Sequence, residues 1–261
     1  MKKNNKITLL VMLMAAAGFL LQSCGKDNKV AYPTSVVLGS ITYQGQPVGL
    51  LSTSNDFIST NNTQNTIIMN QQGANYNGGN IKVFAKNDGT FTINTFDGDY
   101  MIRTAPGTKN PWPDPPAQYF TLKGSQTVNF EVVPYYWVSN YQTSFVNDVF
   151  TATFRLDKST APGTPNFDGI RVYFSTTQFA DAGSSPNVFS RGGNNGFTVA
   201  VPGAGNTVVI GGNCTIKVDL SAMSANEKAI VAASTGHIWA NVAVKATGIT
   251  DALYQKSVML K

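Results

Sequence analysis

Short runs of β-branched and aromatic residues, separated by turns rich in Gly, Asn, Asp and Pro, extend from residue 36 to the end of the chain. The turn signals recur about every 8 to 12 residues, a spacing typical of β-sandwiches. Charged residues make up only 13% of the chain. The abundance of Thr, Asn, Gly, Val and aromatic residues favours strands and turns over helices. We therefore predict an all-β fold.

Three local patterns are specific enough to predict individual elements. Residues 90–96 alternate between inward and outward positions with the period of two that marks a half-buried strand. The triplet Asn87-Asp88-Gly89 precedes them, and these residue types adopt positive φ most easily. We expect this turn to join residues 81–86 to that strand in a β-hairpin. Further along, Ser224 and Glu227 have the spacing of a helix capping box and predict one short helix.

The chain is long enough for two domains of ordinary size. Residues 105–117 contain five prolines and are expected to form a rigid loop, because proline cannot donate a hydrogen bond in a central strand. Pro134 follows the last strand-like run of the first half. We predict tandem β-sandwiches over residues 35–133 and 134–261, the second resembling immunoglobulin or fibronectin type III domains.

The N-terminus has the pattern of a bacterial lipoprotein. A basic start precedes an apolar run over residues 7–21, and Leu21-Gln22-Ser23-Cys24 looks like a lipobox. The pattern predicts a signal peptide at residues 1–23, acylation of Cys24, and a tether over residues 24–34. The alternative is a transmembrane helix, but the apolar run is shorter than the roughly 20 residues that a span requires.

Charge and leader composition indicate where the chain works. The formal net charge is +5, but three lysines lie in the predicted signal peptide, which leaves a mature charge of about +2. No cluster of Lys and Arg follows, so we expect no nucleic-acid partner. Residues 25–29 form a short polar leader similar to those of surface-displayed lipoproteins. We predict a lipid anchor in the outer membrane, facing the cell surface, with the periplasmic face as the alternative.

Several segments together resemble a known family. They are the lipobox, Asp88-Gly89-Thr90-Phe91, Phe96-Asp97-Gly98-Asp99-Tyr100, the run from Val128 to Tyr135, and the run from Ile170 to Thr177. This order is similar to a family of uncharacterised two-domain Bacteroidota lipoproteins encoded beside starch-utilisation-type glycan importers. The resemblance implies a first domain like transthyretin or carboxypeptidase-regulatory sandwiches. It also implies partnership with an outer-membrane importer complex, and it transfers no catalytic residue.

The sequence contains few of the groups that catalysis or metal binding requires. His237 is the single histidine, so a catalytic triad would depend on it alone. Cys214 is expected to be a small buried side chain. Asp88, Asp97 and Asp99 lie in turns, where aspartate is favoured for backbone hydrogen bonding. We predict no catalytic residues, no metal site, no cofactor and no enzymatic activity.

Carbohydrate binding is the chemistry that the remaining residues favour, because aromatic rings can stack on the apolar faces of sugars. Trp112, between two prolines, and the nearby Tyr119 are the first candidates, and Tyr76, in an Asn- and Gly-rich stretch, is the next. The alternative for Trp112 is a hydrophobic plug within its own sandwich, since Trp is mostly buried. Trp137, near the domain junction, is expected to make an interdomain contact.

These observations favour a lipid-anchored, non-catalytic accessory protein of a polysaccharide-uptake system that binds oligosaccharide or docks on the importer. The alternative is a structural or adhesin-like surface lipoprotein that binds protein partners and no sugar.

Overall fold

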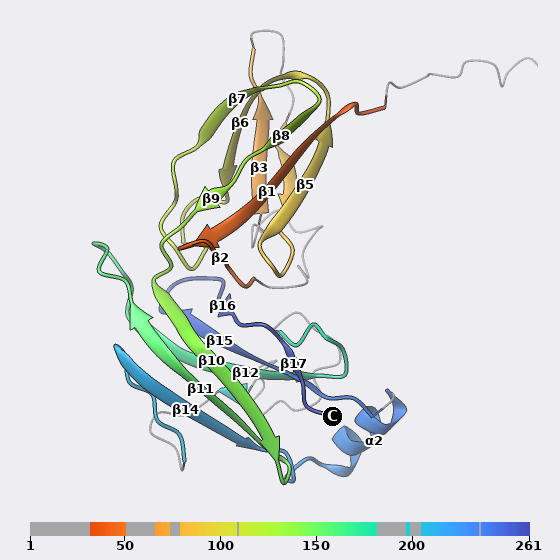
Figure 1. The fold of residues 1–261 in the computed structure, drawn as a ribbon, viewed down its shortest axis with the longest axis vertical. Coiled ribbons are helices and arrows are strands. Elements are labelled where there is room, and N and C mark those ends of the chain that lie inside the picture. Colours follow the sequence, from red (N-terminus) through yellow and green to blue (C-terminus); the bar gives the residue numbers. More distant parts are fainter. Residues whose placement is uncertain are drawn as a thin grey trace, which may run out of the picture. The chain divides into compact units, whose positions relative to one another are not determined.

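The computed structural model describes residues 32–50, 66–73, 79–108, 110–181, 197–198, 205–234 and 236–261. Residues Thr34–Lys261 form one compact unit. Strands dominate it, as Figure 1 shows, and they assemble into face-to-face sheets. The predicted all-β sandwich fold is confirmed.

The first sandwich is built around the N-terminal strand of the compact unit. Strand β1 pairs antiparallel with β2 and β5 and parallel with β8 and β9. The opposing sheet has the antiparallel order β4-β3-β6-β7. The strands of the first sheet are β1 (Ser35–Tyr43), β2 (Gln46–Pro47), β5 (Thr90–Thr95), β8 (Ser125–Thr127) and β9 (Phe130–Glu131). Those of the second are β3 (Thr66–Gln71), β4 (Ile81–Phe84), β6 (Gly98–Thr104) and β7 (Gln118–Leu122).

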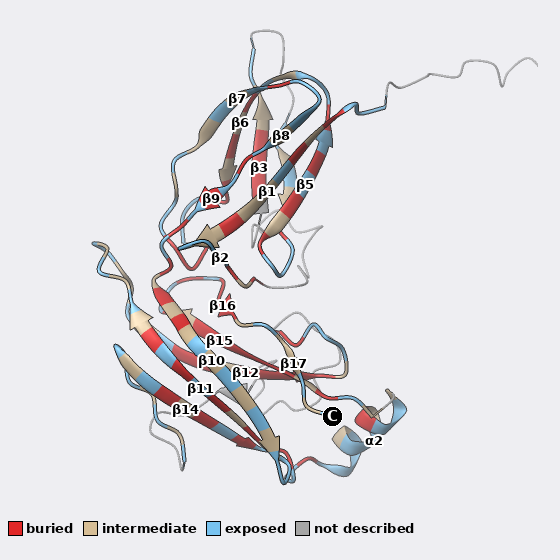
Figure 2. Ribbon diagram, in the orientation of Figure 1, coloured by how far each residue is buried: buried red, intermediate tan, exposed pale blue. Residues whose placement is uncertain are grey.

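The core of this sandwich follows from alternation along the strands. Phe91, Ile93 and Thr95 are buried on β5 while their neighbours face outward, as the period of two predicts. They belong to the sheet that contains β1, and Ile67 and Ile102 contribute from the facing sheet. Figure 2 shows the same alternation of buried and exposed positions along the strands.

The predicted hairpin at Asn87-Asp88-Gly89 is wrong as a pairing, although the turn is present. Gly89 has φ +77°, and the Lys86 amide donates to Thr90 O at 2.8 Å. However, β4 pairs with β3, and β5 pairs with β1, so this turn carries the chain from one sheet to the other. The turn residues determine the local dihedral angles, whereas the strand partners depend on which buried faces meet in the core.

The second sandwich also has two sheets. One has the order β10-β11-β14; the other has the order β13-β12-β15-β16, with β17 also paired to β15. Their strands are β10 (Tyr136–Val146), β11 (Val149–Lys158), β12 (Phe167–Ser175), β13 (Phe197–Thr198), β14 (Gly212–Asp219), β15 (Trp239–Ala246), β16 (Leu253–Tyr254) and β17 (Val258–Met259). Buried residues of both sheets, among them Phe154, Ile216, Val172 and Val242, form a single core.

Helix α2 (Ala225–Ala233) follows β14, and its start is the one that the sequence predicts. Ser224 Oγ accepts from the Glu227 amide, and the Glu227 carboxylate accepts from the Ser224 amide at 2.6 Å. This capping box satisfies two backbone donors that would otherwise lack partners. Within the described residues, no helix is long and apolar enough to cross a membrane.

Several contacts join residues of the two sandwiches inside the compact unit. The Tyr254 amide donates to Gly49 O at 3.0 Å, and Leu253 packs into the first core. The two backbones approach so closely here that a Cβ on residue 49 would lie 1.9 Å from Tyr254 O. Glycine is therefore required at this position. The predicted contact of Trp137 is also present, because its ring meets Tyr43 edge-on at a centroid distance of 5.0 Å.

Candidate functional site

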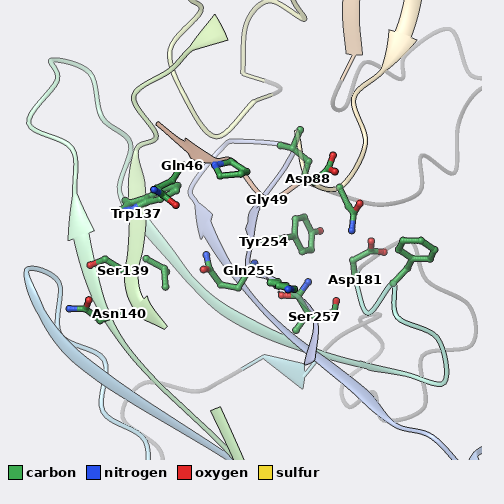
Figure 3. Close-up of a pocket in the computed structure, with 17 residues that line it drawn as sticks. Gln46, Gly49, Asp88, Trp137, Ser139, Asn140, Asp181, Tyr254, Gln255 and Ser257 are labelled. Carbon is green, nitrogen blue, oxygen red and sulfur yellow. Dashed lines mark hydrogen bonds between the residues drawn. The ribbon is translucent and has the colours of Figure 1, made fainter. Parts of the chain in front are cut away.

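A pocket of about 710 Å³ is lined by residues of both sandwiches (Figure 3). Its walls come from β2 and the residues after it, from the turn between β4 and β5, from the start of β10, from the segment after β12, and from β15, β16 and the segment after β16. The lining residues are Gln46, Pro47, Gly49, Leu50, Asn87, Asp88, Trp137, Val138, Ser139, Asn140, Phe179, Asp181, Asn241, Tyr254, Gln255, Lys256 and Ser257. Its volume lies within the range of small-molecule sites, about 300–1,000 Å³.

Aromatic rings contribute three parts of the wall. Trp137 is half-buried on β10, where it is held by Tyr43. Tyr254 is almost fully buried on β16 and packs against the Tyr173 ring at 5.9 Å. Phe179 remains 38% exposed. The pocket therefore combines two supported rings with a third that is more accessible.

The β10 wall owes its shape to a bulge. The register between β10 and β11 shifts between Ser139 and Gln142, and Asn140 has φ +55°. Asparagine tolerates this left-handed conformation better than most residues. A bulge bends the strand and re-aims its side chains. Ser139 and Asn140 thus line the pocket although they belong to one strand and are consecutive in sequence.

Amide side chains supply many of the polar groups in the lining. Asn241 Oδ1 accepts from the Gln255 amide at 3.1 Å, and the same amide donates to Val242 O at 2.9 Å. This bifurcated hydrogen bond holds the segment after β16 against β15. Gln46, Asn87 and Asn140 also line the pocket. Such groups can both donate and accept hydrogen bonds, as sugar hydroxyls require.

Asp88 supplies a negative charge to the wall. Its Oδ1 accepts from the Thr90 amide at 3.0 Å and from Thr90 Oγ1 at 2.7 Å. Partial burial opposes ionisation, but these two hydrogen bonds and the charge of Lys86 outweigh it, so the pKa of Asp88 lies below its usual value. The carboxylate is therefore ionised at neutral pH.

Two further aspartates, Asp181 and Asp251, are buried, and the first of them lines the pocket. Asp181 lines the pocket and is only 2% exposed. Asp251 is equally buried; its Oδ1 accepts from the Ala252 amide at 3.0 Å, while its Oδ2 has no partner among the described residues. Burial raises the pKa of Asp251 to about 7, opposed by the Ala252 amide and by Lys245 and assisted by the charge of Asp181.

The same acidic environment affects a neighbouring tyrosine. Burial is the main cause that raises the pKa of Tyr173 to about 12, and the charges of Asp181 and Asp251 act in the same direction. Arg171 and a hydrogen bond with Tyr254 oppose them. Tyr254 lines the pocket and hydrogen-bonds to Tyr173, whose pKa Asp181 and Asp251 influence.

His237 and Cys214, the base and the thiol that sequence analysis considered, lie outside the pocket lining. His237 Nδ1 lies 3.2 Å from Lys261 O, at the start of the segment leading into β15. Cys214 is buried on β14, as predicted, and this burial raises the pKa of its thiol. No group of three or more His, Cys, Asp or Glu residues able to hold a metal occurs within the described ranges.

The prediction that Trp112 forms a sugar platform is wrong. Its side chain is 0% exposed and belongs to the core of the first sandwich, so no ligand can stack on its ring. The neighbouring Asn110 is also buried, and its amide donates to Ala105 O at 2.7 Å. The proline-rich loop therefore turns the indole inward, which is the plug alternative.

The other predicted site residues have different positions. Tyr119 is 72% exposed on β7, beside Met101 of β6, and does not line the pocket. Its role in carbohydrate binding stays a prediction. Tyr76 and Cys24 lie outside the described residues. Sequence reasoning did identify Trp137, but only as a contact residue; the aromatic cluster at the junction was the signal that could have indicated a pocket wall.

A comparison with known protein families gives a match for the first sandwich. Residues 35–133 match the family described as "Protein of unknown function (DUF3823) N-terminal domain". The match covers the first sandwich, and this part of the chain is similar to that domain family. A search of curated proteins gave no match.

Solved structures similar to this chain come from Parabacteroides and Bacteroides species. A DUF3823 family protein from Parabacteroides merdae is 29% identical, with a TM-score of 0.67, over 87% of this chain and 98% of that one. A DUF3823 family protein from Bacteroides ovatus is 22% identical, with a TM-score of 0.63, over 87% and 98%. A Bacteroides uniformis protein described as "a putative carbohydrate binding protein" is 19% identical, with a TM-score of 0.63, over 88% and 99%. The last two support the fold alone.

Proposed function

We propose that this protein binds a saccharide in the pocket lined by Trp137 and Tyr254, without catalysing a reaction on it. We further propose that it does so as a lipid-anchored accessory protein of an outer-membrane polysaccharide-uptake system, at the cell surface. The observation that carries the binding proposal is the pocket itself, in which aromatic rings and amide side chains converge in a volume of about 710 Å³.

The chemistry of the wall supports a saccharide over a purely apolar ligand. The Trp137 ring offers a face for the C–H groups of a sugar, and its contact with Tyr43 keeps it in one orientation. A supported ring loses little conformational freedom on binding, which favours affinity. The amides of Gln46, Asn87 and Asn140 offer donors and acceptors on the surrounding wall. The similar protein from Bacteroides uniformis, described as "a putative carbohydrate binding protein", points in the same direction.

Trp137→Ala is expected to weaken saccharide binding about 5- to 30-fold, the equivalent of roughly 1–2 kcal/mol of lost contact. Binding is measured by affinity electrophoresis and calorimetry on the chain from Lys26 onward, which contains the whole compact unit. The ligands are soluble starch, galactomannan, glucomannan and mixed-linkage β-glucan. Trp137→Phe keeps an aromatic face and is expected to retain most of the affinity.

Tyr119→Ala is the matched control, because Tyr119 is an exposed aromatic outside the pocket. It is expected to bind as the unmodified chain does. If Tyr119→Ala loses binding while Trp137→Ala keeps it, the binding surface is the outer face of the sheet containing β7 instead. If the protein binds none of the glycans, the adhesin-like alternative is favoured. If prolonged incubation with a glycan releases reducing ends, the proposal that the protein is non-catalytic is contradicted.

Lipid anchoring rests on the lipobox and is tested independently of binding. In a Bacteroidota host supplied with radiolabelled palmitate, the full-length chain is expected to incorporate label and to sediment with outer membranes. Cys24→Ser removes the thiol that would be acylated, so label and membrane association are expected to be lost. Cys214→Ser is the control, since this buried thiol should not affect labelling. Labelling that survives Cys24→Ser would exclude the predicted anchor.

A further inference from the structure

A short segment of the second sandwich is tied to the first sandwich by two backbone hydrogen bonds. The Thr250 amide donates to Thr108 O, between β6 and β7, at 2.9 Å. The Tyr254 amide donates to Gly49 O, just after β2, at 3.0 Å. We call residues 250–254 the bridging segment.

Apolar side chains of the bridging segment pack on both sides of it. Leu253 belongs to the core of the first sandwich, whereas Ala252 and Tyr254 belong to a cluster with Tyr173 of the second. Tyr254 lines the pocket, and so do residues 255–257, which follow it directly (Figure 3). The position of the bridging segment therefore determines the position of this part of the pocket wall.

Asp251 places a carboxyl group between the two cross-sandwich hydrogen bonds. It is 2% exposed, and its Oδ1 accepts from the Ala252 amide at 3.0 Å. Its Oδ2 has no hydrogen-bond partner among the described residues. Ionising a buried carboxyl with an unpartnered oxygen costs free energy, because the charge loses its hydration without full replacement. The neutral acid avoids this cost.

The charged groups around Asp251 do not remove this cost. Burial raises the pKa of Asp251 to about 7, although Lys245 of β15 acts in the opposite direction. Lys245 Nζ is already engaged by a backbone carbonyl at 3.0 Å. Asp181, after β12, also disfavours ionisation. On β12, Tyr173 and Arg171 share this environment, because Asp251 and Arg171 both influence the ionisation of Tyr173.

We infer that Asp251 is a positioning residue that makes saccharide binding depend on its own proton. The neutral acid keeps the bridging segment and the adjoining pocket wall in place, and ionisation releases them, because the carboxylate gains hydration only when the segment moves. The dependence of binding rests on the proposed function, whereas release of the segment can be measured without ligand. Binding then requires the protonated form, so affinity is expected to fall as pH rises through about 7.

Hydrogen exchange tests the release on the free protein, using the chain from Lys26 onward. Protection of a peptide covering the bridging segment, corrected for the intrinsic exchange rate at each pH, is expected to fall about tenfold between about pH 6 and about pH 8. Asp251→Asn cannot ionise and should show no such fall. Protection of the bridging segment should also be lower than that of β11. Equal protection of the two would mean that the segment opens only when the whole protein unfolds, which overturns the inference.

Calorimetry tests the consequence for binding. The four polysaccharides of the panel carry no group that titrates near neutral pH, so a change in affinity reports on the protein. The unmodified chain is expected to bind about 3- to 10-fold more weakly at about pH 8 than at about pH 6. Binding at the higher pH should take up a proton, so the measured enthalpy should vary with the ionisation enthalpy of the buffer.

Two variants assign the pH dependence to Asp251. Asp251→Asn should bind equally well at both pH values and show no proton uptake. Asp219→Asn is the matched control, because Asp219 also accepts from a backbone amide, at 2.8 Å, but does not line the pocket and has a lowered pKa. It should keep the weaker binding at the higher pH.

The possible failures are distinguishable. Equal affinity of the unmodified chain at both pH values overturns the inference and leaves saccharide binding intact. A loss of affinity that persists in Asp251→Asn also overturns it, because another group would then titrate. If no glycan binds at either pH, the proposed function fails and the pH-dependent binding fails with it. Hydrogen exchange then still decides whether ionisation of Asp251 releases the bridging segment.

Discussion

Replacing Asp251 with asparagine is expected to stabilise the folded protein by about 2–4 kcal/mol at about pH 8. Asp251 is fully buried, and burial raises its pKa from 3.8 to about 7. The folded chain therefore keeps a proton between these pH values that the unfolded chain releases. Stability of the unmodified protein should fall as pH rises from about 4 to about 7 and then change little from this cause. Asparagine carries no charge, so this part of the pH dependence should disappear.

The measurement is urea unfolding of both chains at several pH values from about 4.5 to about 8.5. The stabilisation is expected to grow with pH, because the charge that asparagine removes is costly only when the aspartate is ionised. Asp219→Asn controls for a simple change of net charge and is expected to give no gain at high pH, since Asp219 has a lowered pKa. If the free energies of unfolding of Asp251→Asn and of the unmodified chain change with pH in parallel, this carboxyl does not titrate as its burial implies.

Trp112→Ala is expected to destabilise the protein by about 3–5 kcal/mol, the usual cost of removing a large buried aromatic side chain. The indole lies in the core of the first sandwich and is 0% exposed, so its loss leaves a cavity between the sheets. Trp112→Phe should lose less stability than Trp112→Ala, because it keeps an aromatic ring in the core. It also removes the buried Nε1–H, which has no hydrogen-bond partner among the described residues. Denaturant unfolding measures both losses.

Tyr119→Ala provides the contrast for Trp112, since an exposed side chain on the sheet surface is expected to change stability by no more than about 0.5 kcal/mol. Below its unfolding temperature, Trp112→Ala should still bind saccharide as far as it remains folded. Normal stability combined with lost binding would contradict the structure and restore the sugar-platform interpretation of this residue.

Local signals in the sequence were reliable where they depend on short-range geometry. The capping box at Ser224 and Glu227 and the positive φ at Gly89 are both present, because hydrogen bonds and sterics within a few residues determine them. The pairing of β4 and β5 was not predictable in this way. The same tight turn can connect strands of one sheet or of two, and only the packing of buried faces decides between them.

The candidate site shows a similar division. Flanking prolines made Trp112 look preorganised for binding, but rigidity does not determine whether a ring points into the core or out of it. The pocket collects residues from positions 46 to 257, so no short motif marks it. Asp181 and Asp251 lie seventy positions apart, and their mutual electrostatic influence follows only from the fold.

The packing of Leu253 into the first core has a consequence for how the chain folds and how it can be divided. The hydrophobic core of residues 35–133 is complete only when a residue from near the C-terminus is in place, and Tyr254 adds a backbone bond to Gly49. The first sandwich thus depends on a residue that lies far along the chain from its own strands. This long-range contact raises the contact order and couples the two sandwiches in one cooperative unit. A fragment ending at residue 133 would expose the apolar surface that Leu253 covers.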